Sequence, residues 1–558
     1  MVDSQCGEDA SERLLSQHKE AVSRVSDRIA SFHARKIPFR IFHGNTNSTR
    51  LSDRTRDATV DISTLDHVIS VSPSKRTCLV EPNVPMDRLV AATLEHGLVP
   101  PVVPEFPGIT VGGGFAGTAG ESSSFKYGFF DGTVTWFEVV LADGEVVTAS
   151  ETERADLFHG MAGTFGSMGV ITLFEMRLIP AKEFVELSYI RVGDIEQAQE
   201  VIKQVSKQEG VDFVDGIMFA PEKGVVLAGR LANRGEKNQD LPIVTFTKPW
   251  DQWFYLHAEE RMDSTEITGP GPQSPSSPSH PRDLIPLRDY LFRYDRGAFW
   301  TGRFAYKYFC IPFTRTIRWL ADYFMHTRIM YHALHRSGLY QHFIIQDMAL
   351  PNKNIPEFSH WLDRELPHIY PRWLCPLRHG TSVSMNPHLR NRPVSSAEPS
   401  PTSTSTSKTD STPDPRSSEG DDDGSDDFDN ALLNIGVWGE TPPNTLHVTI
   451  NRLIESKLKS LGGMKWLYAQ TFYTEDEFWS IYDRKWYDGM RKKYRADGHI
   501  PSVYEKVRTR DIFEVDDDGK VLRDAALPVE KGVWSIWPIA GVYGVLSALK
   551  GGDYLRKR

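Results

Sequence analysis

The residues with the clearest chemical potential are glycines and serines gathered between Ile109 and Gly128, in the run ITVGGGFAGTAGESSSFKYG. A fold needs so much glycine in one stretch where the backbone takes positive φ angles or approaches another group closely. Main-chain N–H groups clustered beside serine hydroxyls form a good binding surface for phosphate oxygens. Tight turns or bulges between strands produce similar runs, so this stretch alone leaves both interpretations open.

A second candidate phosphate-binding turn follows the apolar segment Pro38–His43, which predicts a short strand. His43–Thr49 reads HGNTNST, with small polar side chains and one glycine directly after that strand. A polar Asx- and Ser-rich turn without a ligand explains the same residues equally well. A third glycine-rich stretch, Gly163–Gly169, runs into the predicted strand Val170–Pro180.

The elements that must position these loops follow from hydrophobic spacing. Ser11–Arg35 has apolar residues at helical intervals and predicts one amphipathic helix. Pro85–His96 predicts a second helix, ended by Gly97. Predicted strands lie at Thr59–Ile62, Val68–Val71, Thr77–Glu81, and in a hairpin formed by Val134–Leu141 and Glu145–Ala149. The order indicates an α+β fold and not a doubly wound nucleotide domain. The glycine run also fails the GxGxxG fingerprint, because no strand-to-helix unit surrounds it.

Composition limits the class of protein. A chain of 558 residues is long enough for two or more domains with a substantial core. Its net charge of −10 argues against a nucleic-acid binder. The four cysteines are scattered without metal-ligand spacing, so we expect reduced thiols and no resident metal. The polar N-terminus does not resemble a secretory signal peptide.

The second half changes to mixed strands and aromatic-rich helices, and we place a domain boundary at residue 180. Two stretches, Ser264–His280 and Arg392–Asp429, cannot bury enough apolar surface to fold and are predicted to be insertions. Phe299–Tyr340 is crowded with aromatic side chains, which fits either core packing or the wall of a large apolar site. The predicted division is 1–180, a substrate (cap) domain at 181–391, the insertion at 392–429, a continuation with closing helices at 430–515, and a C-terminal segment at 516–558.

The C-terminal stretch Gly532–Leu549 contains no charged residue and is followed by basic residues. Its eighteen residues are at the lower limit for crossing a bilayer. Two tryptophans, a tyrosine and several glycines suit a membrane interface better than a hydrocarbon core. A contact with a membrane surface, a buried core segment and a true span remain as alternatives.

Several short motifs together resemble a known family. In the first half these are Val80–Pro82, Pro104–Glu105, Thr110–Gly113, Gly120–Ser124, Lys126–Gly128, Leu141–Gly144, Asp156–Phe158 and Ile179–Lys182. Beyond residue 180 they include Leu284–Arg288, Phe299–Trp300, Gln346–Met348, Tyr370–Pro376, Ile435–Gly436, Tyr468–Ala469, Glu477–Trp479 and Pro501–Tyr504. The chain is similar to flavoproteins of the vanillyl-alcohol oxidase and p-cresol methylhydroxylase (PCMH) type. Within them it resembles the Δ24-sterol reductases, the 24-dehydrocholesterol reductase family, over roughly residues 35–508.

The resemblance implies a two-subdomain FAD-binding PCMH-type domain, followed by an α+β substrate domain. It implies an oxidoreductase of sterol biosynthesis that acts on a CH–CH group, with FAD as cofactor and NADPH as co-substrate. It also implies a membrane-associated enzyme, at the endoplasmic reticulum and facing the cytosol, with the cytoplasm as the alternative. Animal members carry an N-terminal membrane segment that this sequence lacks, so the apolar C-terminus is expected to serve instead.

The resemblance also assigns cofactor-binding residues. Covalent flavin in this superfamily is attached through a histidine or cysteine near the first loop; that histidine position aligns nearer Asn47 than His43, so noncovalent FAD is expected. The negative charge of Glu121 is unfavourable beside phosphates, so Glu121 is assigned a contact with a ribose hydroxyl or a hydrogen bond within its own loop. The assigned residues are Gly44, Asn45, Thr46, Asn47, Ser48, Thr110, Val111, Gly112, Gly113, Gly114, Gly117, Thr118, Gly120, Glu121, Ser122, Ser123, Gly169 and Val170.

Reduction of an isolated alkene needs a hydride and a proton on adjacent carbons. Protonation at C24 places positive charge on the tertiary C25, which then receives hydride from the flavin N5. The protein must supply an acid and a long, dry, apolar pocket lined by aromatic rings. Tyr468 and Asp347 are the preferred acids among the polar and aromatic residues Arg288, Tyr290, Arg293, Asp347, Trp438, Tyr468 and Tyr473, each of which also fits a packing or surface role. Two other functions stay open, an FAD-dependent oxidase of an alcohol or hydroxy acid that uses oxygen, and a non-catalytic sterol-binding protein.

Overall fold

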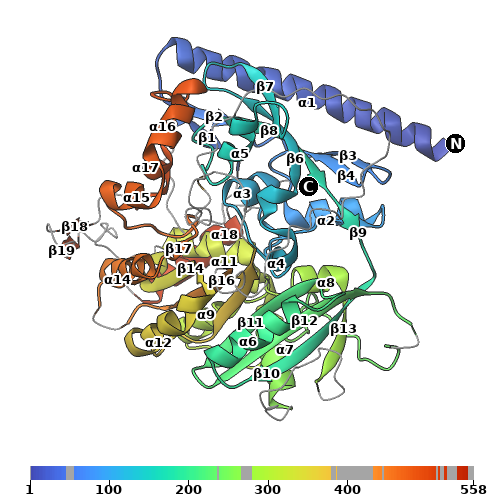
Figure 1. Cartoon of the computed structure of the whole chain (residues 1–558), viewed down its shortest axis with the longest axis vertical. Helices are drawn as coiled ribbons and strands as arrows, with labels where there is room; N and C mark the ends of the chain where they lie inside the picture. The colour runs from blue at the N-terminus through green and yellow to red at the C-terminus, as the bar shows by residue number, and fades with distance from the viewer. Residues whose placement is uncertain are drawn as a thin grey trace, which may run out of the picture.

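The structure is a computed structural model that describes residues 2–44, 56–235, 238–264, 280–337, 339–378, 385, 431–442, 445–509, 513–515, 521–524 and 537–550. Two sheets organise these residues, a five-stranded sheet in the N-terminal half and an eight-stranded antiparallel sheet that follows it (Figure 1). The predicted α+β class, with a second sheet domain after the first, is confirmed.

The N-terminal sheet is antiparallel, with strand order β3-β4-β8-β6-β7. Its strands are β3 (Val68–Ser72), β4 (Thr77–Val80), β6 (Val134–Val140), β7 (Val146–Ser150) and β8 (Val170–Arg177). β6 and β7 form the predicted hairpin. Helix α1 (Val2–Ala34) lies along this half at the top of Figure 1 and buries Ile29 and Phe32, as its amphipathic spacing predicts.

Shorter elements complete this half. β1 (Arg40–Phe42) pairs in parallel with β2 (Thr59–Asp61), and β5 (Leu98–Val99) pairs with β9 (Ile179–Pro180). Helix α2 (Met86–Leu94) ends before Gly97, which takes a φ of +68°. Helix α5 (Ala155–Met161) packs on β7.

The glycine run was expected to be a loop, and this expectation is wrong for two parts of it. Val111–Ala116 forms helix α3, and Ser124–Tyr127 forms helix α4. The Thr110 hydroxyl accepts a hydrogen bond from the Gly113 N–H and caps α3. The glycines are needed for close approach: a Cβ at Gly112 would lie 3.0 Å from both the Cβ and the carbonyl oxygen of Pro82.

The second sheet has strand order β13-β10-β12-β11-β15-β16-β14-β17, and every pair is antiparallel. Its strands are β10 (Phe184–Val192), β11 (Phe213–Ala220), β12 (Lys223–Ala232), β13 (Arg282–Pro286), β14 (Phe343–Pro351), β15 (Arg372–Leu377), β16 (Leu432–Glu440) and β17 (Met464–Lys465). Helices α6 (Ile195–Ser206), α12 (Ile355–Glu365) and α14 (His447–Ser460) share one apolar core with it.

The remaining helices form two groups: an aromatic-rich layer, and a return segment in which the chain goes back to the N-terminal half. The layer consists of α7 (Phe254–Asp263), α8 (Leu287–Leu291), α9 (Gly302–Tyr308), α10 (Arg315–Leu320) and α11 (Thr327–Ser337). The return consists of α15 (Glu475–Ile481), α16 (Arg484–Lys493) and α17 (Val503–Val507), which lie beside β1 and β2 in Figure 1. There the buried Arg491 guanidinium donates to the Ser167 carbonyl at 2.6 Å.

The C-terminal region is described in part. β18 (Phe513–Val515) pairs with β19 (Val521–Asp524), and helix α18 (Ile539–Lys550) packs against α11. No helix among the described residues is both long and apolar enough to cross a membrane. Apart from Ser264 and His280, the two predicted insertions lie outside the described residues.

Candidate active site

A large cavity lies where the two halves meet. The N-terminal half contributes the glycine run, the Gly166–Gly169 region and β1. The sheet domain contributes side chains from β14, β15 and β16 and from the segment after β17. The predicted site residues that line this cavity are Thr110, Gly112, Gly113, Gly114, Gly117, Gly120, Gly169, Val170, Asp347 and Tyr468.

The other described residues of the predicted cofactor site lie behind this wall. Val111 is buried, and the Thr118 carbonyl accepts a hydrogen bond from the Trp466 indole at 2.9 Å. Glu121, Ser122 and Ser123 are buried and tie the run to the second domain, since the Ser122 carbonyl accepts from the Val214 N–H at 2.7 Å. Gly44 is described but does not line the cavity, whereas Asn45, Thr46, Asn47 and Ser48 lie outside the described residues.

Tyr468 and Asp347, far apart in sequence, meet on the cavity wall. The Tyr468 hydroxyl donates to Asp347 Oδ2 at 2.6 Å. Asp347 is on β14 and faces Gly436 across the pair with β16; a Cβ at Gly436 would lie 2.7 Å from Asp347 Oδ1. The Trp466 N–H donates to the Asp347 carbonyl at 3.0 Å, which anchors the segment that carries Tyr468. Backbone contacts therefore bring the Tyr468 and Asp347 side chains together.

Burial raises the pKa of Asp347, and hydrogen bonds from Tyr468, Asn434 and Trp438 oppose that rise. Burial and the nearby Asp347 carboxylate raise the pKa of Tyr468 well above its usual value. Tyr468 therefore keeps its proton at neutral pH, within hydrogen-bond reach of Asp347 on the wall of a largely apolar cavity.

Arg293 and Asp215 form a fully buried ion pair beneath the cavity at 2.9 Å. Asp215 also accepts hydrogen bonds from the Tyr294 hydroxyl at 2.7 Å and the Trp373 indole at 3.1 Å. Tyr290 stacks its ring under the Arg293 guanidinium. The other cap-domain candidates differ in place: Trp438 lines the cavity, Tyr473 is buried without lining it, and Arg288 is exposed.

The aromatic segment Phe299–Tyr340 serves both of the roles left open for it. Tyr331 lines the cavity. Phe299 and Trp300 are buried in the core, with the Phe299 ring 5.0 Å from that of Trp438. Phe106 joins them, at 5.9 Å from Trp438 and 6.3 Å from Tyr331. An apolar, aromatic wall thus faces the Tyr468–Asp347 pair.

Sequence reasoning missed several polar side chains that line the cavity, among them Arg40, Glu105, Asn434 and Lys506. Lys506 comes from α17 and donates to the Gly166 carbonyl at 2.9 Å. No spacing rule links Lys506 to a loop that lies 340 residues earlier. Glu105 stands in a motif that carries the family resemblance, but the motif alone gives it no role.

These residues fit FAD. Cationic side chains of Arg40 and Lys506 suit the two phosphates. The mixed apolar and aromatic lining suits the flat ring of the cofactor.

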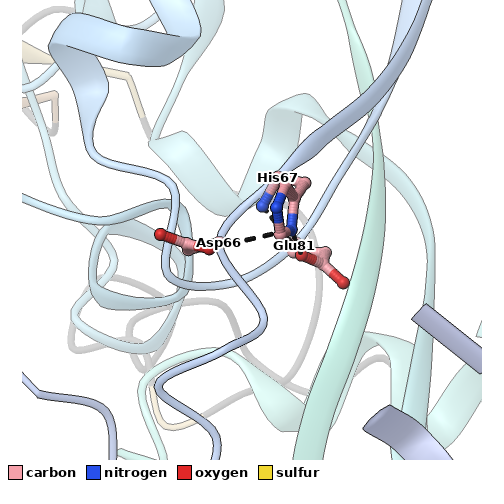
Figure 2. A group of neighbouring side chains, drawn as sticks. All are labelled: Asp66, His67 and Glu81. Carbon is pink, nitrogen blue, oxygen red and sulfur yellow. Dashed lines mark hydrogen bonds and ion pairs between the residues drawn. The ribbon is translucent and has the colours of Figure 1, made fainter. Parts of the chain in front are cut away.

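A separate cluster of Asp66, His67 and Glu81 has ligand atoms close enough to hold a metal ion (Figure 2). His67 Nδ1 lies 2.9 Å from Glu81 Oε2 and 3.7 Å from Asp66 Oδ1. The other Glu81 oxygen contacts His18 Nδ1 at 2.8 Å, and His18 Nε2 contacts Glu138 at 3.1 Å. Burial lowers the pKa of His18, but hydrogen bonds to Glu138 and Glu81 and the charges of these two residues raise it to about 9. Hydrogen bonding thus explains the cluster, which fastens α1 to β4 and β6.

Comparisons with known proteins agree with this geometry. Residues 20–150 match the family described as FAD binding domain. The chain thus contains an FAD-binding domain in its first half.

More particularly, it is a homologue of the Delta(24)-sterol reductases. It is 28% identical to the human Delta(24)-sterol reductase over 450 residues, which cover 79% of this chain and 76% of the human one. It is also 28% identical to the Arabidopsis thaliana enzyme over 485 residues, with 81% and 77% covered. A Delta(24)-sterol reductase homologue of Caenorhabditis elegans is 26% identical over 464 residues, with 79% and 77% covered.

Proposed function

We propose that this protein reduces the Δ24 side-chain double bond of a sterol, with noncovalent FAD as cofactor and NADPH as hydride donor. The observation that carries the proposal is the Tyr468–Asp347 pair, which faces the glycine run of the FAD-binding domain across one apolar cavity. When bound and reduced by NADPH, FAD would supply the hydride that reaches C25.

Tyr468 is the proposed proton donor to C24, and Asp347 holds its hydroxyl in place at 2.6 Å. Protonation at C24 leaves positive charge on C25. The rings of Trp438, Tyr331 and Phe106 offer π faces that stabilise such a charge, and they exclude water from it. The proton and the hydride thus arrive at adjacent carbons inside a dry site.

The cofactor is proposed to lie along the wall formed by the glycine run and the Gly169–Val170 turn. Thr110, Gly112, Gly113, Gly114, Gly117 and Gly120 lie on this wall, and Arg40 and Lys506 offer counter-charges to the phosphates. Val111, Thr118, Glu121, Ser122 and Ser123 support it from behind. Asn45, Thr46, Asn47 and Ser48, with Gly44, remain the proposed second wall.

α18 is the proposed contact with a membrane surface. One side of the helix packs on α11, where Ala548 is buried. The exposed large apolar side chains of α18 and of the two residues before it are Trp537, Val542, Tyr543, Leu546 and Leu549, all at least 40% exposed. Vesicle flotation tests this: Leu546→Glu is expected to weaken binding, whereas Val146→Glu, at an exposed apolar position on β7, is expected to leave it unchanged. Equal binding of both variants to vesicles would contradict the proposed membrane contact.

The function is tested by mixing the purified flavoprotein with NADPH without oxygen. The flavin absorbance is expected to bleach, and a Δ24-sterol added afterwards is expected to restore it. An oxidase of an alcohol or hydroxy acid would not bleach with NADPH. Protein purified without flavin would instead favour a non-catalytic sterol-binding role.

A further inference from the structure

Trp466 joins the glycine run of the first domain to the Tyr468–Asp347 pair of the second. Its indole N–H donates to the Thr118 carbonyl of the glycine run at 2.9 Å, across 348 residues of sequence. Its backbone N–H donates to the Asp347 carbonyl at 3.0 Å, and Tyr468 follows two residues later. The Trp466 side chain lines the cavity and is only 6% exposed. One residue therefore contacts both walls between which the cofactor and the sterol would lie.

The acceptor, the Thr118 carbonyl, belongs to a tightly bonded part of the glycine run. Thr118 has a φ of +49°, a left-handed conformation that is unusual for a residue with a branched side chain. Its N–H donates to the Phe115 carbonyl at 3.2 Å, and its hydroxyl donates to the Gly117 carbonyl at 2.8 Å. Its neighbours Gly117 and Ala119 both line the cavity. The Trp466 hydrogen bond thus reaches the glycine run at the part that faces the cavity.

Two backbone hydrogen bonds also join the glycine run to the second domain, farther along the run. The Ser122 carbonyl accepts from the Val214 N–H at 2.7 Å, and the Ser124 carbonyl accepts from the Arg378 N–H at 3.2 Å. Neither Ser122 nor Ser124 lines the cavity. These bonds hold the two domains together behind the cavity wall, whereas the Trp466 bond lies at the cavity itself.

A buried ion pair fixes the segment after β17. Lys465 Nζ donates to Glu455 Oε1 at 2.8 Å and to the Gln470 carbonyl. The same Glu455 oxygen accepts from the Phe472 N–H at 3.0 Å. The Lys465 and Glu455 side chains are 2% and 3% exposed, so salt in solution screens the pair little. Lys465 and Phe472, which lie on either side of Tyr468 in sequence, are thus both attached to α14.

The proposed reaction needs the cofactor and the acid at a fixed separation. The proton and the hydride arrive at adjacent carbons, so the acid hydroxyl and the hydride-donating atom must both reach one double bond. The two groups belong to different domains, and an error of about 1 Å in such an arrangement can slow a reaction by about 10²-fold. A hydrogen bond that joins the two domains at the cavity meets this need.

We propose that Trp466 is a positioning residue, which holds the glycine run at a fixed separation from the Tyr468–Asp347 pair through its hydrogen bond to the Thr118 carbonyl. The inference rests on the proposed function. Trp466 acts through Tyr468 and transfers no proton itself. Loss of its N–H donor therefore slows the step that uses Tyr468, which is reduction of the sterol. It leaves reduction of the flavin by NADPH unchanged.

The test measures the two half-reactions of the holoenzyme separately, by stopped flow without oxygen. Trp466→Phe keeps an aromatic ring and loses the N–H donor. Reoxidation of the reduced flavin by a saturating Δ24-sterol should be slower by about 10²-fold. Bleaching by NADPH, FAD content and the KM for the sterol should stay near their wild-type values. Trp466→His should recover part of the lost rate, because the imidazole Nε2–H occupies the position of the indole N–H.

Tyr504→Phe is the matched control. The Tyr504 hydroxyl donates to the Tyr473 carbonyl at 3.2 Å in a buried place, and neither residue lines the cavity. This variant also removes a buried donor to a carbonyl, and both half-reactions should be unchanged in it. A double variant tests whether Trp466 acts through Tyr468: in Tyr468→Phe, the added Trp466→Phe should cause little further loss.

Three results would overturn the positioning role alone. The first is a Trp466→Phe variant that reduces the sterol as fast as the wild type. The second is a pair of Phe and His variants that are equally slow. The third is a loss of FAD, or of both half-reactions together, which would show a purely structural role. A wild-type holoenzyme that NADPH bleaches but no Δ24-sterol reoxidises would overturn the proposed function as well.

Discussion

Replacing Tyr468 with Phe removes one oxygen atom from the cavity and leaves the ring in place. The lost hydroxyl is the proposed proton donor, and it also gives Asp347 a hydrogen bond of 2.6 Å that lowers the pKa of that carboxyl. Without it the pKa of Asp347 rises further. The change therefore alters both the acid and its partner.

The two effects have different sizes. Loss of a hydrogen bond to a buried charged group costs about 1.5–3 kcal/mol of stability. Loss of a general acid lowers a rate by about 10²–10⁴-fold. Tyr468→Phe is therefore expected to reduce kcat by at least about 10²-fold while the protein stays folded and binds FAD.

Tyr494→Phe is the matched control. Tyr494 donates to Asp156 at 2.7 Å, but this pair lies outside the cavity and the Asp156 side chain is 39% exposed. The stability cost there should be below about 1 kcal/mol, and sterol reduction should be unchanged. Single-turnover oxidation of the reduced flavin by a Δ24-sterol measures the step directly. A Tyr468→Phe variant as fast as Tyr494→Phe would refute Tyr468 as the donor.

Three further predictions concern stability. Asp215→Ala leaves the buried Arg293 guanidinium without its 2.9 Å partner and should cost about 3–5 kcal/mol in urea unfolding; Arg293→Met in the same chain should recover much of this, and no recovery would contradict the buried pair. Gly112→Ala introduces a Cβ with contacts at 3.0 Å and should lower both the melting temperature and FAD content, whereas Gly489→Ala has open space and should not. Burial lowers the pKa of His18, but Glu138 and Glu81 raise it from 6.5 to about 9 in the folded protein, so the stability from His18 is complete below pH 6.5 and is lost as pH rises through 9. The melting temperature should follow that loss in the wild type and not in His18→Ala, and equal pH profiles would contradict the role given to His18.

Local patterns in the sequence were enough for most elements of the first half. Helical spacing predicted α1, and the Ala142–Gly144 turn predicted the β6–β7 hairpin, because both depend on neighbours in the chain. Residues of the glycine run line the cavity, but the sequence did not predict that part of the run forms helix α3. Its glycines are set by close packing, such as that of Gly112 against Pro82, which no local pattern reveals.

The cavity's polar groups show the limit of sequence reasoning more sharply. Tyr468 and Asp347 were predicted as separate candidates. The hydrogen bond from the Trp466 backbone N–H to the Asp347 carbonyl explains why the two side chains meet. Lys506 lies on helix α17, which follows the second sheet in sequence but contacts the first domain through the Gly166 carbonyl.

The most direct test of the account is to incubate the flavoprotein with NADPH and a Δ24-sterol and to weigh the product by mass spectrometry. The account predicts a product that has gained two hydrogen atoms at the side-chain double bond, formed by the wild type and strongly reduced with Tyr468→Phe. No gain of mass across several Δ24-sterols, from protein whose flavin is bound and bleached by NADPH, would contradict it.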